Sequence, residues 1–369
     1  MQIQELNKEQ QKAVNHIDGP MLVLAGAGSG KTKVLTNRIA NLIENGISPY
    51  NILAITFTNK AAKEMKDRVV SLIGSTANNI QISTFHSLGL RILKENYSLL
   101  GYERNFTIID SDDVLTIIKK IMKDLNMSKE YYNPREIKNK ISSAKNEMMD
   151  VEKFSKIEFD HKVVEVYKTY QKKLKQGNSV DFDDLLILPI KLFKNYPNVL
   201  NDYQERYKYI LIDEYQDTNY IQELLVFLIA GKNRNICVVG DDDQGLYRFR
   251  GATIRNILEF PGHFAEGECK QVKLVTNYRS ERRIIDFYNK WMSTTDGRAY
   301  DFMWKNFRFE KKIVPPEGKK AAKVGVIKCS GKDLLDDWYE QVHSFITQLK
   351  SSGVLTDYNQ IAVLCKSVK

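Results

Sequence analysis

The segment AGAGSGKT at residues 25–32 constrains the fold more than any other feature of this chain, because it continues directly from the apolar run MLVLA. A glycine-rich turn between a buried strand and a helix presents free backbone N–H groups and the positive end of the helix dipole, both of which favour phosphate. Lys31 would reach the outer phosphates and the Thr32 hydroxyl would bind magnesium. The strict P-loop pattern is not met, since Ala25 replaces its first glycine. The segment predicts a nucleoside triphosphate site on an α/β sheet.

A second segment, ILIDEYQDT at residues 210–218, places two adjacent carboxylates at the end of a predicted strand. Asp213 can hold magnesium through water, and Glu214 can orient and deprotonate an attacking water. Alone, such an acidic pair is more often a solvated loop, and a glycine-rich segment alone can be an ordinary strand-to-helix turn. Both segments in one chain, in α/β order, favour a site for ATP and Mg²⁺.

Short apolar runs alternate with amphipathic stretches at the start of the chain, which predicts a parallel sheet with crossover helices. The predicted strands are 21–25, 52–57 and 80–83, and the predicted helices are 31–45, 59–73 and 85–100. From about residue 111 to 206 the pattern is helical, which predicts an all-helical insertion. Strands resume at 209–213, 236–241 and 272–275, so the sheet is expected to contain sequence from both sides of the insertion.

The composition changes after a helix predicted at 280–292. Residues 293–320 combine many lysines with Gly and Pro-Pro, as in a linker or an irregular excursion. A strand at 323–329, a helix at 333–351 and a strand at 361–365 then predict the start of a second α/β unit. A second parallel domain needs more strands than these two, so we expect it to be incomplete, with residues 361–365 as an exposed or poorly paired edge.

Length and charge narrow the class of function. At 369 residues the chain is too long for one compact core, and its net charge of +9 favours a polyanion such as nucleic acid. The four cysteines have no C-x-x-C spacing, which argues against a zinc ribbon or disulfide framework and predicts a reducing, cytoplasmic location. No apolar run approaches a membrane span, so we expect neither a signal peptide nor an anchor.

Two further segments end predicted strands with polar side chains. AITFTNKAA at residues 54–62 offers hydroxyls, an amide and a lysine to phosphate and sugar, and Phe57 could stack on a base. An ordinary helix cap by Thr58 or Asn59, with Phe57 in the core, is the alternative. ISTFHS at residues 82–87 repeats the design, although a lone histidine such as His86 is more often packed or capping than catalytic.

The segment VVGDDDQGLYRFRGA at residues 238–252 joins three acids and Gln244 to aromatic and arginine residues. A glutamine at a strand end can sense a γ-phosphate, while aromatics beside arginines can stack on unpaired bases. Packed core aromatics flanked by surface arginines are the alternative. In NYRS at residues 277–280, Tyr278 could stack on adenine and Arg279 could reach the γ-phosphate.

Eight segments fall in the order found in the UvrD/Rep/PcrA family of superfamily 1 DNA helicases, which this chain resembles over roughly residues 3–290. They are LNKEQQKAV (6–14), AGAGSGKT, AITFTNKAA, ISTFHS, VDFDDLL (180–186), ILIDEYQDT, GDDDQGLYRFRGA and NYRS. The resemblance implies an enzyme that moves 3′ to 5′ along single-stranded DNA and couples ATP hydrolysis to unwinding, in DNA repair or replication. It implies ATP and Mg²⁺ as cofactors, and single-stranded DNA and single-strand/duplex junctions as partners.

The resemblance also implies roles for individual residues. Lys31 and Thr32 match the phosphate and magnesium contacts, Asp213 the magnesium carboxylate, and Glu214 the base that activates water. Gln10 would read the adenine edge, Tyr278 would stack on the base, Gln244 would sense the γ-phosphate and Arg279 would act as an arginine finger. The implied ATP-binding set is Gln10, Ala25, Gly26, Ala27, Gly28, Ser29, Gly30, Lys31, Thr32, Lys33, Tyr278 and Arg279. The implied DNA-binding set is Phe57, Asn59, Thr84, His86, Tyr247, Phe249 and Arg250.

The same resemblance implies a domain organisation. Residues 1–106 and 180–279 would form a first RecA-like ATP-binding domain, 107–179 its helical insertion, and 280–369 an incomplete second RecA-like domain. Phe249 stands where the family has tryptophan and Gly245 where serine is common, and the later family motifs have no match in this sequence. The chain is therefore expected to be the N-terminal portion of such a helicase, with ATP and single-strand binding but feeble hydrolysis.

Two alternatives remain open. A naturally short, non-motor module could use ATP to gate single-stranded DNA binding, although it would have no need of a water-activating Glu214. A small-molecule P-loop kinase would fit the Lys31 loop but would leave the aromatic and arginine segment and the basic charge unexplained.

Overall fold

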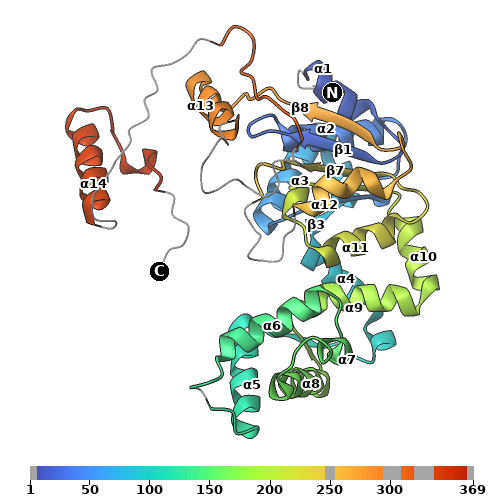
Figure 1. The fold of residues 1–369 in the computed structure, drawn as a ribbon. Helices are drawn as coiled ribbons and strands as arrows, with labels where there is room; N and C mark the ends of the chain where they lie inside the picture. The colour runs from blue at the N-terminus through green and yellow to red at the C-terminus, as the bar shows by residue number, and fades with distance from the viewer. Residues whose placement is uncertain (1–5, 129, 246–253, 294–308, 320–335, 364–369) are drawn as a thin grey trace. The chain divides into compact units, whose positions relative to one another are not determined.

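A computed structural model describes residues 6–128, 130–245, 254–293, 309–319 and 336–363 of the chain. The chain divides into two compact units, Met1–Lys319 and Lys320–Lys369. Figure 1 shows the sheet and helices of the first unit, and helix α14 (Asp336–Ser351) of the second. None of the helices in the described ranges is long and apolar enough to cross a membrane.

The first unit is built on a parallel sheet of six strands in the order β3-β2-β6-β7-β1-β8. The strands are β1 (Met21–Ala25), β2 (Ile52–Thr56), β3 (Gln81–Thr84), β6 (Tyr209–Ile212), β7 (Ile236–Gly240) and β8 (Lys270–Leu274). In the centre of the sheet, Val23 of β1 lies between Val239 of β7 and Val272 of β8. Strands β1, β2, β6 and β7 are buried throughout. Their continuous apolar sequences follow from this, because a parallel sheet is covered on both faces.

Helices cover both faces of this sheet (Figure 1). Alternate residues of a strand point to opposite faces, so Val23 of β1 packs into one core cluster and Leu24 into the other. Helices α1 (Lys8–Asn15), α2 (Lys31–Glu44) and α3 (Asn59–Ile73) contribute to the cluster of Val23. The cluster of Leu24 takes side chains from α4 (Phe85–Asn96), α9 (Asp184–Asn195), α10 (Pro197–Arg206), α11 (Tyr220–Ala230) and α12 (Arg255–Glu259).

The chain between β3 and β6 contains a group of helices with a core of its own. These helices are α5 (Ser111–Asp124), α6 (Pro134–Asn146), α7 (Val151–Phe154) and α8 (His161–Gln176). A short parallel pair, β4 (Thr107–Ile108) and β5 (Ser179–Val180), flanks them. The sequence predicts an uninterrupted helical stretch here, and β5 is missed because two residues are too few to show a periodicity.

The α/β fold class with a parallel sheet is confirmed, and each predicted strand of the sheet is placed to within two residues at either end. The helix predicted at 85–100 ends earlier, with α4, and continues as the 3₁₀ turn η3 (Tyr97–Leu100). Helix α13 (Arg282–Ser293) and α14 lie where helices are predicted. The other short turns are η1 (Pro49–Asn51), η2 (Gly74–Asn79), η4 (Tyr215–Asp217), η6 (Phe260–His263) and η7 (Tyr358–Gln360).

The described residues near the C-terminal end bear on two predictions. Residues 309–319, expected to form a linker or an irregular excursion, form no helix or strand, and Val314 bridges to Thr276 just beyond β8. The strand predicted at 361–365 is wrong for residues 361–363, which adopt no strand and leave Val363 exposed. Residues 364–365 and the strand predicted at 323–329 lie outside the described residues.

Candidate functional site

The glycine-rich loop lies between β1 and α2, at the carboxyl end of the sheet. Gly28 has a left-handed backbone, with φ 68°, and a Cβ atom built on it would lie 2.4 Å from Asn277 Oδ1 and 2.8 Å from Arg279 Cβ. Only glycine fits at this position, because the loop is packed directly against the NYRS segment. Tyr278 N–H also donates to the Gly28 carbonyl, at 2.9 Å. The fold thus brings the loop, Tyr278 and Arg279 together.

Lys31 and Thr32, at the start of α2, meet the two acids that follow β6. Lys31 Nζ lies 3.0 Å from Glu214 Oε2, and Thr32 Oγ1 lies 3.5 Å from Asp213 Oδ2. The backbone of Glu214 is left-handed, with φ 50°, which turns the chain sharply after β6. Burial, and then the neighbouring Glu214, raise the pKa of Asp213 to about 6. Carboxylate and hydroxyl oxygens are the hard ligands that Mg²⁺ prefers, so this pair fits that ion.

A chain of hydrogen bonds continues from Glu214 to Gln244. Gln216 Nε2 donates to Glu214 Oε2 at 2.8 Å, and Gln216 Oε1 accepts from Asp241 N–H at 3.0 Å. Gln244 Nε2 in turn donates to Asp241 Oδ2 at 2.6 Å. Glu214, after β6, and Gln244, after β7, are therefore joined through Gln216 and Asp241. No role was predicted for these two connecting residues. Gln216 stands within ILIDEYQDT, two residues after Glu214, which is the signal that could have found it.

Gln10 belongs to the N-terminal turn of α1 and faces the same loop. Its side chain completes a capping box with Asn7, and its Nε2 donates to the Ser29 carbonyl at 3.0 Å. Asn7 Nδ2 donates to the Tyr278 hydroxyl at 2.7 Å. Gln10 Oε1 accepts from Asn7 N–H at 3.0 Å and, as an amide oxygen with two lone pairs, can accept a second donor such as an adenine amino group. Gln10 and Tyr278 thus both flank the glycine-rich loop.

The rest of the predicted ATP-binding set belongs to the loop or to α2. Ala25 is the last residue of β1, and Gly26, Ala27, Ser29, Gly30 and Lys33 complete the connection into the helix. Ser29 Oγ donates to the Gly26 carbonyl at 2.6 Å, which closes the turn. Gly30 caps α2 with a left-handed backbone, φ 89°, so no side-chain cap occupies the helix N-terminus. Its N–H groups are therefore available to phosphate.

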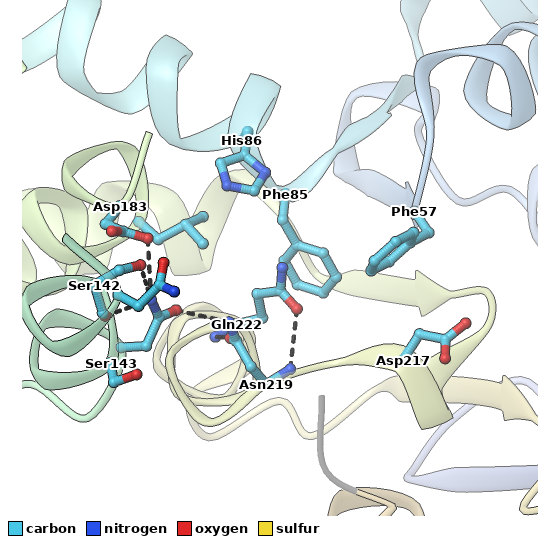
Figure 2. Close-up of a pocket in the computed structure, with 12 residues that line it drawn as sticks. Phe57, Phe85, His86, Ser142, Ser143, Asp183, Asp217, Asn219 and Gln222 are labelled. Carbon is cyan, nitrogen blue, oxygen red and sulfur yellow. Dashed lines mark hydrogen bonds between the residues drawn. The ribbon is translucent and has the colours of Figure 1, made fainter. Parts of the chain in front are cut away.

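A second concave site lies beside the sheet and is shown in Figure 2. It has a volume of about 550 Å³. Its lining comprises Phe57, Phe85, His86, Asn139, Ser142, Ser143, Asn146, Asp183, Leu186, Asp217, Asn219 and Gln222. Among these lining residues there is no lysine or arginine, and burial lowers the pKa of His86. The pocket therefore suits an uncharged, flat group such as a nucleobase better than a phosphate.

Four of the predicted DNA-binding residues lie at the end of β3 or just after β2 and β3. Phe57 and His86 line the pocket, whereas Asn59 is exposed at the first turn of α3. Thr84 also caps α4, by accepting from Ser87 N–H at 3.2 Å. Of the two residues proposed as an ordinary cap in the first segment, Thr58 caps α3 by accepting from Ala61 N–H at 3.1 Å. Tyr247, Phe249 and Arg250 lie outside the described residues.

The polar half of the pocket was not predicted from the sequence. Asn146 Nδ2 donates to Asp183 Oδ1 at 3.0 Å, and Asn219 Nδ2 donates to Asn146 Oδ1 at 2.9 Å (Figure 2). Asn139, Ser142, Ser143 and Asn146 share one face of α6, because residues three and four apart are neighbours on a helix. That spacing of small polar residues was the available signal, although using it requires knowing that α6 packs beside α9 and the start of α11.

Comparison with known proteins gives the family. The UvrD/REP helicase N-terminal domain matches residues 6–265 of this chain. ATP-dependent DNA helicase PcrA of Bacillus subtilis (strain 168) is 49% identical over 303 residues, which cover 81% of this chain and 41% of the relative. ATP-dependent DNA helicase PcrA of Staphylococcus aureus (strain NCTC 8325 / PS 47) is 45% identical over 306 residues, or 82% of this chain and 42% of the relative. The chain spans about two fifths of the length of these curated relatives. With its glycine-rich loop, paired acids and ordered segments, the chain belongs to the UvrD/Rep helicase family.

Proposed function

We propose that this chain carries the ATP-hydrolysing and single-strand-binding part of an ATP-dependent DNA helicase. Its PcrA relatives are named as such helicases, which supports the proposal. The finer proposal is 3′-to-5′ movement along single-stranded DNA in the cytoplasm, with unwinding at single-strand/duplex junctions during repair or replication. In this organisation, residues 1–106 and 180–279 are the first RecA-like domain, 107–179 its insertion, and 280–369 the beginning of the second.

The proposed ATP site uses the residues around the glycine-rich loop. The α2 N-terminus and Lys31 bind the phosphates, Tyr278 stacks on adenine, and Gln10 accepts from its amino group. Mg²⁺ bound by Thr32 and Asp213 would neutralise charge on the phosphates. An ATP phosphate competes with Glu214 for the Lys31 ammonium, and the released carboxylate can then take a proton from the attacking water. Gln244 and Arg279 contact the γ-phosphate.

The proposed DNA site is the pocket beside Phe57. A base that enters it can stack on the aromatic ring and meet amide and hydroxyl groups of α6 and α11. Strands β2 and β6 are parallel neighbours, so the segments that follow them begin at the same edge of the sheet. Phe57 of the proposed DNA site and the acids of the proposed ATP site therefore lie along that edge. This adjacency would let a change of the bound nucleotide alter the affinity for DNA.

The observation that carries the proposal is the 3.0 Å contact between Lys31 and Glu214, which places a phosphate-binding ammonium beside a water-activating carboxylate. We expect Lys31→Ala to weaken binding of a fluorescent ATP analogue by roughly 10- to 100-fold, the usual effect of losing a charge-assisted hydrogen bond. Fluorescence titration measures this directly. Lys12→Ala, which removes an exposed lysine of α1, is the matched control. Equal affinity of the Lys31 variant and the wild type would contradict the proposed ATP site.

Phe57 gives the corresponding test of the DNA site. We expect Phe57→Ala to weaken binding of a fluorescein-labelled oligo(dT) by about 1–3 kcal/mol, because stacking on one base is lost. Affinity for the ATP analogue should not change. Phe159→Ala is the control, since Phe159 is 91% exposed and does not line the pocket. A fall in DNA affinity that is equal in the two variants would count against the pocket and favour a nonspecific surface effect.

A further inference from the structure

Three consecutive acids, Asp241, Asp242 and Asp243, follow β7 directly. Their carboxylate oxygens lie within 4.8 Å of one another. Like charges at this separation repel strongly when water is excluded, so the arrangement requires a cation. Lys311 supplies it: its ammonium contacts Asp241 and Asp242 and lies 3.1 Å from Asp243 Oδ2. The Lys311 side chain is only 1% exposed.

The segment that carries Lys311 is fixed on both sides of it. Phe309 N–H donates to Asp242 Oδ2 at 2.9 Å. On the other side, Ile313 N–H donates to Asn289 Oδ1 at 3.1 Å, and Asn289 Nδ2 donates back to the Ile313 carbonyl at 2.7 Å. The position of the ammonium is thus set by backbone contacts as well as by its own charge.

The same segment touches the glycine-rich loop. A Cβ atom built on Gly26 would lie 2.2 Å from Ile313 Cδ1, so the isoleucine occupies the space that a side chain in the loop would need. Ile313 is itself buried. Segment 309–319 therefore contacts both the phosphate loop after β1 and the acids after β7, the two sides of the proposed ATP site.

Asp241 is the group that Lys311 shares with Gln244. Its Oδ1 atom contacts the Lys311 ammonium and accepts from Asp243 N–H at 3.1 Å. Its Oδ2 atom accepts from Gln244 Nε2 at 2.6 Å. Its backbone N–H donates to Gln216, which leads on to Glu214. A shift of the Asp241 carboxylate would therefore move the side chain proposed to sense the γ-phosphate.

We propose that Lys311 is a positioning residue of the ATP site, which holds Gln244 in place through the Asp241 carboxylate. The inference rests on the proposed ATP site. Without the ammonium, three adjacent buried carboxylates repel one another, Asp241 moves and Gln244 loses its fixed partner. In this proposal Gln244 contacts only the γ-phosphate. Displacing Gln244 therefore lowers the affinity for ATP but not the affinity for ADP. Burial alone would lower the pKa of Lys311, but the three carboxylates together raise it, so the charge persists over the physiological range.

The test compares two fluorescent nucleotides, mant-AMPPNP as a non-hydrolysable ATP analogue and mant-ADP. We expect Lys311→Gln, which keeps most of the side-chain length but removes the charge, to weaken mant-AMPPNP binding roughly tenfold while mant-ADP binding stays unchanged. Lys311→Arg should restore most of the affinity. Lys312→Gln removes the adjacent, exposed lysine and should change neither nucleotide. In a Gln244→Ala background, Lys311→Gln should have no further effect, because both substitutions break the same contact.

The outcomes separate the inference from the function on which it rests. If the wild type binds neither nucleotide, the proposed ATP site is wrong and Lys311 has nothing to position. If the wild type binds both and Lys311→Gln is unchanged, the inference alone is wrong. If Lys311→Gln loses both nucleotides equally and melts at a lower temperature, Lys311 stabilises the fold and does not act through Gln244. A penalty additive with that of Gln244→Ala would also contradict the inference.

Discussion

Glu214→Gln is expected to slow hydrolysis of bound ATP by about 10²- to 10⁴-fold, the usual contribution of a positioned general base. Glutamine has nearly the same shape as glutamate but cannot take a proton from the attacking water. The variant also loses the ion pair that Glu214 makes with Lys31 at 3.0 Å, so the ammonium becomes more available to phosphate. Affinity for mant-AMPPNP should therefore hold or rise.

The rate is best measured in a single turnover, with protein in excess over radiolabelled ATP, because this reads slow chemistry independently of product release. Glu205→Gln is the matched control, since its carboxylate is highly exposed on α10. A Glu214 variant that hydrolyses ATP at the wild-type rate would exclude Glu214 as the base. A Glu214 variant that no longer binds ATP would show that the role of Glu214 is structural.

Lys145→Ala is expected to destabilise the fold by roughly 3–5 kcal/mol, the cost of breaking a buried ion pair by removal of one partner. Lys145 is 3% exposed, and its ammonium lies 2.6 Å from Asp181 Oδ2 and 2.9 Å from Asp184 Oδ1. The Tyr170 hydroxyl also donates to Asp181, at 2.7 Å. The cluster ties α6 and α8 of the helical insertion to the start of α9. Without the ammonium, two buried carboxylates face each other with no cation between them, and only the Tyr170 hydroxyl and their own backbone N–H groups remain as donors among the contacts described.

The effect should depend on pH in a defined direction. Burial, and then Asp181, raise the pKa of Asp184, which stands at about 6 with Lys145 in place. A carboxyl group whose pKa is raised by folding contributes stability below its unfolded pKa and loses that contribution as the pH rises through the folded value. The pKa is expected to rise further when the ammonium is removed. The deficit of Lys145→Ala relative to wild type should therefore be larger at pH 8 than at pH 5.

Urea unfolding followed by circular dichroism at the two pH values measures both quantities. Lys140→Ala is the control, because Lys140 belongs to the same helix, α6, its side chain is half exposed, and it pairs with Glu158 outside that helix. Water screens the exposed ammonium, so we expect the loss of this pair to cost about 0–1 kcal/mol. A loss for Lys145→Ala no larger than that of the control, or a deficit that shrinks as the pH rises, would contradict this account of the cluster.

The sequence predicts the sheet well because its strands are short apolar runs between turns. It also predicts the loop that ends in Lys31 and the acids after β6, since the residues that form each of these segments are contiguous in the sequence. Contacts between residues far apart in the sequence could not be predicted in this way. Lys311 lies 70 residues from Asp241 in a stretch without periodicity, and nothing local marks it as the partner of three acids.

The pocket proposed to bind DNA could also be predicted only in part from the sequence. Phe57 and His86 stand just after strand ends in the sequence, and the structure places both in one pocket. The pocket also needs Asn146 of α6 and Asn219 at the start of α11, which meet only because α6 of the insertion packs beside α9 and the start of α11. The VDFDDLL segment was recognised only as a match to the family. In the structure, two of its acids, Asp181 and Asp184, hold buried Lys145.

We propose that one chain binds ATP at the Lys31 loop and single-stranded DNA in the pocket beside it. The most direct test is to titrate one preparation of this chain with mant-AMPPNP and with fluorescein-labelled oligo(dT), following fluorescence and anisotropy. The account predicts binding of both ligands, with Lys31→Ala losing nucleotide but keeping DNA, and Phe57→Ala losing DNA but keeping nucleotide. A chain that binds the nucleotide but not the oligonucleotide would contradict the account and favour a P-loop enzyme acting on a small molecule.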